Sequence, residues 1–196
     1  MTTPSSYVLT GRRAAHGETA LQRIILLVLV FALTAAGIEA QTQPTTTGSA
    51  SLPARPQGYV SDYAKVINQR AKRQLETKLD GLRKRAGIEF VVVTLETTGG
   101  EDLFDYSLAA ARVWKLARGA NDRGGILLML AIKDRQWRVQ LTDSLRNDTP
   151  EALLRVHGDR MVAAMRRGDT GAGVRVFVDG LVADLAARRG FKNLPD

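Results

Sequence analysis

A run of seven consecutive apolar residues, 126–132, constrains the fold of this chain more than any other feature. The run is too short to cross a membrane, and it lacks the alternation expected of a strand with one exposed face. It therefore predicts a strand at the centre of a sheet that is covered on both faces.

The residues on either side of this run predict a hairpin and a loop. Residues 133–135 are charged or turn-forming, and apolar and polar side chains then alternate over residues 136–141, as in a half-exposed strand. Before the run, residues 121–125 (NDRGG) form a polar, flexible loop. A loop of this kind at the end of a buried strand can hold a ligand.

Other segments complete an α/β pattern. Residues 88–96 are rich in β-branched side chains and predict a second buried strand. Strand, helix and strand in this order predict a right-handed crossover and a parallel pair. We expect a three-layer α/β/α sandwich with a small mixed sheet, in which the hairpin adds an antiparallel strand to the parallel pair and helices cover both faces. Apolar residues recur at helical spacing over residues 67–82, 103–114, 153–165 and 174–185.

Several residues mark the expected ends of these helices. Asn68 suits an N-cap, and Gly87 can end the helix that follows it. Thr149 and Pro150 suit the N-cap and first position of the third helix.

The amino terminus has the pattern of an export signal. Arginines precede a largely apolar run over residues 24–38, and Ala40 offers a cleavage position. The run is short for a bilayer-crossing helix, which needs roughly 20 residues. We interpret residues 1–40 as a signal peptide or, alternatively, as a retained membrane anchor, and residues 41–57 as a disordered linker. In both cases we expect a periplasmic or other extracytoplasmic location, with or without a membrane tether.

Composition excludes several classes of site. The chain has no cysteine, and of its two histidines only His157 lies outside the expected leader. Disulfides and thiolate metal sites are thus excluded, and carboxylates would have to hold any metal ion. The net charge is +8, but the basic residues lack the interleaved aromatic residues of a nucleic-acid platform. Nucleic acid is therefore not an expected partner.

Acidic and amide side chains come together at one predicted end of the sheet. Asn121 and Asp122 precede the central strand and Asp143 follows the antiparallel strand, so these residues lie at the same end as the loop after Asp143. Oxygen ligands of this kind suit calcium or magnesium. Asp62, whose path is not predictable, could join either end. The candidate metal ligands are Asn121, Asp122, Asp143, Asp148, Glu151 and Asp62.

The same residues also have a purely structural interpretation. Asp122 and Asp148 suit turns, and Glu151 suits the first turn of a helix. His157 lies four residues from apolar neighbours on either side, which favours a packed or hydrogen-bonded histidine over a catalytic one. The sequence leaves both the metal site and the structural interpretation open.

The chain contains four further motifs in order: residues 60–64 (VSDYA), 121–124 (NDRG) before the apolar strand, 133–135 (KDR) before Arg138 and Val139, and 168–173 (GDTGAG) before the last helix. In their order and spacing these motifs resemble the TPM domain family. The resemblance covers roughly residues 58–185 and implies a three-layer α/β/α sandwich that is usually exported and often tethered to a membrane. It also implies bound divalent metal in some members, and acid phosphatase activity in a plant thylakoid branch. We accordingly assign residues 58–190 to a TPM-like domain and residues 191–196 to a tail.

The chain departs from the family pattern after the second hairpin strand. Where the family typically has glycines, this chain has Thr142, Ser144 and Asn147, and it has Arg146 in place of a glutamate. Glu151 stands where the family has an aspartate. Loss of glycines prevents close approach of the backbone to a bound anion. The departure therefore weakens the implied phosphatase activity more than it weakens a binding role.

Two functions compete on these observations. The first is an exported TPM-domain protein that binds calcium or magnesium and acts as an interaction or maintenance module of the cell envelope, with a membrane surface or membrane protein as partner. The second is a metal-dependent acid phosphatase acting on phosphomonoesters, in which the cation polarises a phosphoryl oxygen and activates water. The lack of a histidine acid, of a serine triad and of a glycine-rich nucleotide fingerprint favours the first function. No catalytic residue is assigned.

Overall fold

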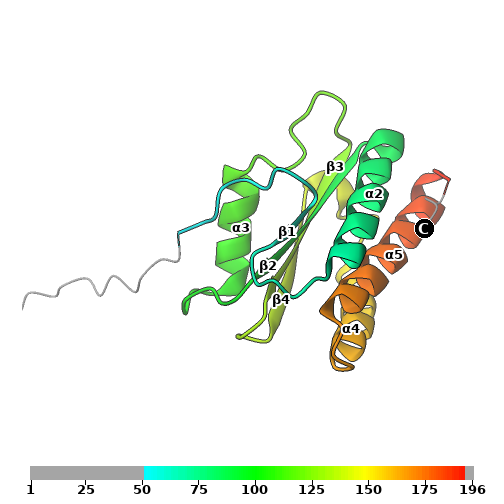
Figure 1. The fold of residues 1–196 in the computed structure, drawn as a ribbon. Coiled ribbons are helices and arrows are strands. Elements are labelled where there is room, and N and C mark those ends of the chain that lie inside the picture. Colours follow the sequence, from blue (N-terminus) through cyan, green and yellow to red (C-terminus); the bar gives the residue numbers. More distant parts are fainter. Residues whose placement is uncertain (1–50, 193–196) are drawn as a thin grey trace, which may run out of the picture. The chain divides into compact units, whose positions relative to one another are not determined.

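The computed structural model describes residues 51–192, which lie in one compact unit. The expected leader, residues 1–40, lies outside the described residues, as do most of the expected linker and the end of the tail. Figure 1 shows three layers, with helix α3 on one face of a central sheet and helices α2, α4 and α5 on the other.

The sheet has four strands in the order β1-β2-β3-β4. Strands β1 (Val60–Asp62), β2 (Ile88–Leu95) and β3 (Gly124–Ala131) are parallel, and β4 (Gln136–Leu141) is antiparallel to β3. The three-layer α/β sandwich expected from the sequence is confirmed. The sheet has one strand more than expected, because part of the extended segment before the first helix pairs with β2.

Within residues 51–192, four α-helices and one short 3-10 helix surround the sheet. Asn68 and Gly87 cap α2 as predicted, since the Asn68 side chain accepts from the Ala71 amide and Gly87 has a φ of 67°. The predicted N-cap of α4, Thr149, was wrong by one residue, because Pro150 is the N-cap. The Thr149 hydroxyl donates instead to the Leu145 carbonyl at 2.6 Å. The helices are α2 (Gln69–Ala86), α3 (Leu103–Val113), η1 (Asp143–Leu145), α4 (Glu151–Met165) and α5 (Thr170–Arg189).

The hydrophobic core has two parts, one on each face of the sheet. Every residue of β2 and β3 is buried. Because successive strand residues point to opposite faces, Val92 and Leu128 pack on the side of α2 and α5, whereas Val93 and Met129 pack on the side of α3. The unbroken apolar runs of the sequence are thus explained by a sheet that is covered on both sides.

Residues assigned to the linker contact the domain. Leu52 packs against the core part under α3, and the Trp114 Nε1–H group donates to the Pro53 carbonyl at 3.1 Å. Arg55 forms an ion pair with Glu89 at 3.1 Å. Leu52, Pro53 and Arg55 thus contact the domain although they precede Gly58. Within residues 51–192, no helix is long and apolar enough to cross a membrane.

Candidate functional site

The candidate residues Asn121 and Asp122 lie at the amino end of the sheet, as the sequence predicts. They precede β3, whose first residue, Gly124, pairs with Ile88. The Asp122 side chain is only 4% exposed; it accepts from the Gly119 amide at 2.7 Å and from Arg83 at 3.2 Å. Asn121 is exposed. Asp122 therefore shapes its own loop and forms an ion pair with the last turn of α2.

Arg83 and Glu89 complete this network, and the sequence analysis missed both of them. Glu89 is 6% exposed and is the one charged residue in β2. It is paired with Arg83 at 3.4 Å and with Arg55, and it accepts from the Ala117 amide. Partial burial lowers the pKa of Arg83, but the charges of Asp122 and Glu89, together with a hydrogen bond to Tyr59, raise it overall. An acid within an otherwise apolar buried strand was the signal available in the sequence, because such a group requires a cationic partner.

The acids after β4 lie at the same end of the sheet. The Thr142 amide donates to the Gly125 carbonyl at 3.0 Å, which places this loop beside the start of β3. Asp143 is 92% exposed and is paired with Arg146 at 2.7 Å, whereas Asp148 is paired with Arg189 at 2.7 Å.

Arg189 connects this loop to the end of α5. Its guanidinium also donates to the carbonyls of Ser144 and Arg123. Glu151 is exposed in the first turn of α4.

These residues share one end of the sheet but do not form a ligand cage. Each of the three aspartates Asp122, Asp143 and Asp148 forms an ion pair with an arginine. Among residues 51–192, no group of three or more His, Cys, Asp or Glu side chains is placed to hold a metal ion. An open hollow of about 500 Å³ lies beside Asp122, between residues 83–87 and residues 120–123.

Asp62, whose position the sequence could not predict, lies at the opposite, carboxyl end of the sheet. It pairs in register with Thr94. Its carboxylate accepts from the amides of Val66 at 3.0 Å and Ile67 at 2.8 Å, and from the Thr94 hydroxyl. Asp62 thus organises the turn that leads into α2, away from the other five candidates.

Asp134 has a similar role at the tip of the hairpin. Hydrogen bonds from the Thr98 amide and from the Thr97 hydroxyl lower the pKa of its carboxyl group. The group therefore stays ionised at neutral pH and ties the hairpin to the loop after β2.

His157 is part of the core, as the sequence favours. It is 3% exposed, and its Nε2 lies 2.6 Å from a carboxylate oxygen of Asp184 on α5. Its ring also packs edge-on against Phe177. The Nδ1 atom is buried and has no hydrogen-bond partner in the described part of the chain. Because the carboxylate can only accept, Nε2 is the donor in this bond. This pair connects α4 to α5.

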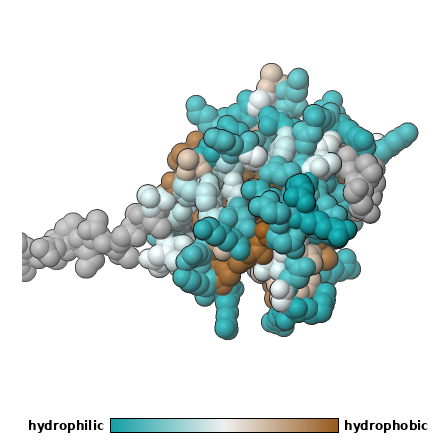
Figure 2. All heavy atoms as spheres, in the orientation of Figure 1, coloured by the Kyte–Doolittle hydropathy of each residue, from teal (hydrophilic) through white to brown (hydrophobic). Residues whose placement is uncertain are grey.

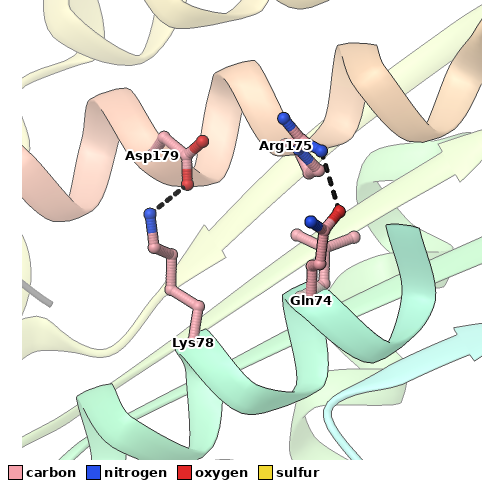
Figure 3. Close-up of a pocket in the computed structure, with 5 residues that line it drawn as sticks. Gln74, Lys78, Arg175 and Asp179 are labelled. Carbon is pink, nitrogen blue, oxygen red and sulfur yellow. Dashed lines mark hydrogen bonds and ion pairs between the residues drawn. The ribbon is translucent and has the colours of Figure 1, made fainter. Parts of the chain in front are cut away.

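A small hollow between α2 and α5 is bridged by the protein's own side chains. Figure 3 shows Lys78 pointing to Asp179 and Arg175 pointing to Gln74 across the space between the two helices. The first contact is 2.6 Å long and the second 2.8 Å, and the hollow measures about 160 Å³. These bonds cross-link the helices, so the hollow is a structural contact.

Comparisons with known proteins agree with the fold and the order of motifs. A family model described as the TPM domain matches residues 60–184. The chain is similar to the solution structure of the N-terminal domain of a protein from P. gingivalis, with 27% identity over 73% of this chain and 91% of that one and a TM-score of 0.62. No curated protein sequence matches the chain.

Two further solution structures share the fold. The N-terminal domain of cg2496 protein from Corynebacterium glutamicum has 18% identity over 75% of this chain and 93% of that one, with a TM-score of 0.53. The BA42 protein from the psychrophilic bacterium Bizionia argentinensis has 17% identity over 67% of this chain and 88% of that one, also with a TM-score of 0.53. Two of the three similar structures are isolated domains, so a unit of this kind folds without the rest of its protein.

Proposed function

Because this chain belongs to the TPM domain family, we propose that it is an exported binding module of the cell envelope and that it does not hydrolyse phosphate esters. The observation that supports this proposal is the pairing of Asp122, Asp143 and Asp148 with arginines. A metal-dependent hydrolase needs carboxylates that are open to a cation and to the water that the cation activates. Here arginines pair with the partly or fully buried carboxylates of Asp122 and Asp148, and the exposed Asp143 is paired with Arg146.

The loop after β4 supports the same conclusion. Its backbone amides form turns within the loop: Leu145 bonds to Thr142, Arg146 to Asp143, and both Asp148 and Thr149 to Leu145. A loop that cradles a phosphate needs amides that point outward. Thr142, Ser144 and Asn147, which replace the family glycines, therefore lie within a hydrogen-bonded turn.

The proposed module shows no phosphatase activity. We expect the fragment of residues 41–196 to release no phosphate from a generic phosphomonoester such as p-nitrophenyl phosphate, with calcium, magnesium or manganese present. The rate is measured at acid and neutral pH, with Asp143→Asn and Asp122→Asn fragments prepared in parallel as controls. Chelator-sensitive turnover that falls in either variant would establish the phosphatase and refute this part of the proposal.

Calcium and magnesium bind to this module only weakly, at the amino end of the sheet. The cation has to compete with Arg189 for Asp148 and with Arg146 for Asp143, so we expect a Kd of about 1 mM, at the weak end of extracellular calcium modules. At that Kd, calcium at about 10 mM stabilises the fold by about 1.4 kcal/mol. A thermal melt in a calcium series measures the effect.

An arginine variant tests the cause of the weak affinity. Arg189→Gln leaves Asp148 without its competing cation and should lower the calcium Kd, whereas Asp143→Asn should raise it. If calcium does not change the melting temperature of the unmodified fragment or of either variant, the proposed calcium binding is refuted. If the unmodified fragment is saturated by calcium well below 1 mM, the arginines do not compete with the cation.

A further inference from the structure

A groove lies at the carboxyl end of the sheet, opposite the end that carries Asp122, Asp143 and Asp148. The hairpin between β3 and β4 forms one wall, and the last turn of α4 forms the other. The volume is about 390 Å³, and most of the exposed lining is apolar. We call it the hairpin groove; its lining residues are 130–132, 135–137, Val162, Met165 and Arg166.

The hairpin groove has positive charge without a matching carboxylate. Arg135 and Arg166 line it, and no acidic residue does. The hollow between α2 and α5 contains Asp179, and the hollow at the amino end contains Asp122, each bonded to a cation of the same hollow. An apolar floor with two uncompensated guanidinium groups at its rim is complementary to an anion attached to an apolar chain.

Arg135 has a backbone conformation that its side chain does not favour. Its φ is 54°, in the left-handed region that glycine adopts freely and other residues adopt rarely. Glycine would suit this turn better than arginine. The presence of a long cation here is therefore not explained by the turn itself.

A second hollow continues the same surface around the hairpin. It shares residues 135–137 with the hairpin groove and adds Arg138, Phe104, Leu103 and Asp102. The Asp102 carboxylate accepts from the amides of Phe104 and Asp105 as the N-cap of α3. The Arg138 guanidinium lies 5.3 Å from the centre of the Phe104 ring, and Phe104 is 44% exposed. Exposed aromatic rings beside arginines suit the region of lipid headgroups. The face of the molecule drawn in Figure 2 is mostly hydrophilic and has only small apolar areas.

We propose that this carboxyl-end surface docks the domain on a membrane that contains anionic lipids, with an acyl chain in the hairpin groove and the lipid phosphate between Arg135 and Arg166. The proposal rests on the envelope function proposed above and names its partner. Docking of this kind combines burial of apolar surface with attraction between arginines and the headgroups.

Vesicle binding tests the docking surface. The fragment of residues 41–196, which lacks the apolar leader, is mixed with phosphatidylcholine vesicles with or without phosphatidylglycerol, and the partition coefficient is measured by flotation. We expect binding only to the vesicles with phosphatidylglycerol, and a loss of binding in high salt because the attraction is screened. Arg135→Gln/Arg166→Gln should bind about thirty-fold more weakly, since each arginine near an anionic surface contributes about 1 kcal/mol.

Two control variants separate docking from total charge and from folding. Arg85→Gln/Arg118→Gln removes the same charge from the opposite end of the sheet, where both residues are exposed, and should bind almost as well as the unmodified fragment. Arg135→Gly removes one arginine at a position that favours glycine, so its melting temperature should stay the same or rise while its binding falls.

Tryptophan fluorescence shows where the lipid lies. Trp137 lines the hairpin groove, whereas Trp114 is 4% exposed in the core part under α3. Phosphatidylglycerol with brominated acyl chains should therefore quench part of the emission, and Arg135→Gln/Arg166→Gln should prevent it.

Three outcomes would overturn the proposal. They are equal binding to vesicles without phosphatidylglycerol, an equal loss of binding in both double variants, and competition by free inorganic phosphate that abolishes binding. A fragment that neither binds vesicles nor hydrolyses phosphate would refute the docking surface and leave the binding function in place. Hydrolysis would refute that function and leave the vesicle result unaffected.

Discussion

Replacing Gly158 with alanine is expected to destabilise the domain by about 3 kcal/mol, at the upper end of the usual cost of overpacking a core. A methyl group at this position on α4 would lie 2.0 Å from Cζ2 and 2.3 Å from Cη2 of Trp137. Real atoms cannot approach so closely, so the indole ring or the helix has to move. The free energy of unfolding from urea denaturation measures the effect.

A second substitution identifies the clash as the cause. Phenylalanine in place of Trp137 lacks the ring atoms that alanine at position 158 would meet. The double variant Gly158→Ala/Trp137→Phe should therefore lose less stability than the sum of the two single variants. Additive losses would show that Gly158 is needed for another reason, and a stable Gly158→Ala protein would contradict the packing described here.

Replacing Arg83 with methionine is expected to cost about 2 kcal/mol. Removing one partner of a buried ion pair typically costs about 3–5 kcal/mol of stability. The expected cost is lower here because the Arg83 side chain is 36% exposed, so that solvent screens its charge. The variant leaves Asp122 without its cation and leaves Glu89 with only Arg55. Urea denaturation again measures the loss.

The neighbouring lysine provides a matched control. Lys84 is 74% exposed and is paired with Asp80 one turn away on the same helix, so Lys84→Met should change stability little. Asp122→Asn in the Arg83→Met background should recover part of the loss, because it removes a buried charge. Equal effects of the two methionine variants would show that the Arg83 network is a surface feature without energetic importance.

The layers of this fold could be predicted because their signals are local. An unbroken apolar run means a strand that is buried on both faces, and the caps Asn68 and Gly87 follow from the chemistry of one helical turn. Strand β1 was missed because three residues of alternating type are too few to show a period.

The candidate site could be predicted only as a location. Topology placed Asn121, Asp122 and Asp143 at one end of the sheet. It could not show that Arg189, forty-one residues beyond Asp148, would bind that acid. Pairing between distant side chains depends on how elements pack, and no periodicity in the sequence encodes it. Glu89 was missed for the same reason, although its charge within β2 was visible.

The edges of the sheet limit how the domain can meet other chains. Strands β1 and β4 are the edges. A long, flat, apolar edge is a template on which a foreign strand can add, but β1 ends after three residues in a turn that Asp62 closes. The middle of β4 carries Arg138, which leans over the Phe104 ring. Neither edge suits strand addition, so a partner has to meet this domain through its side chains, and the sheet itself resists aggregation.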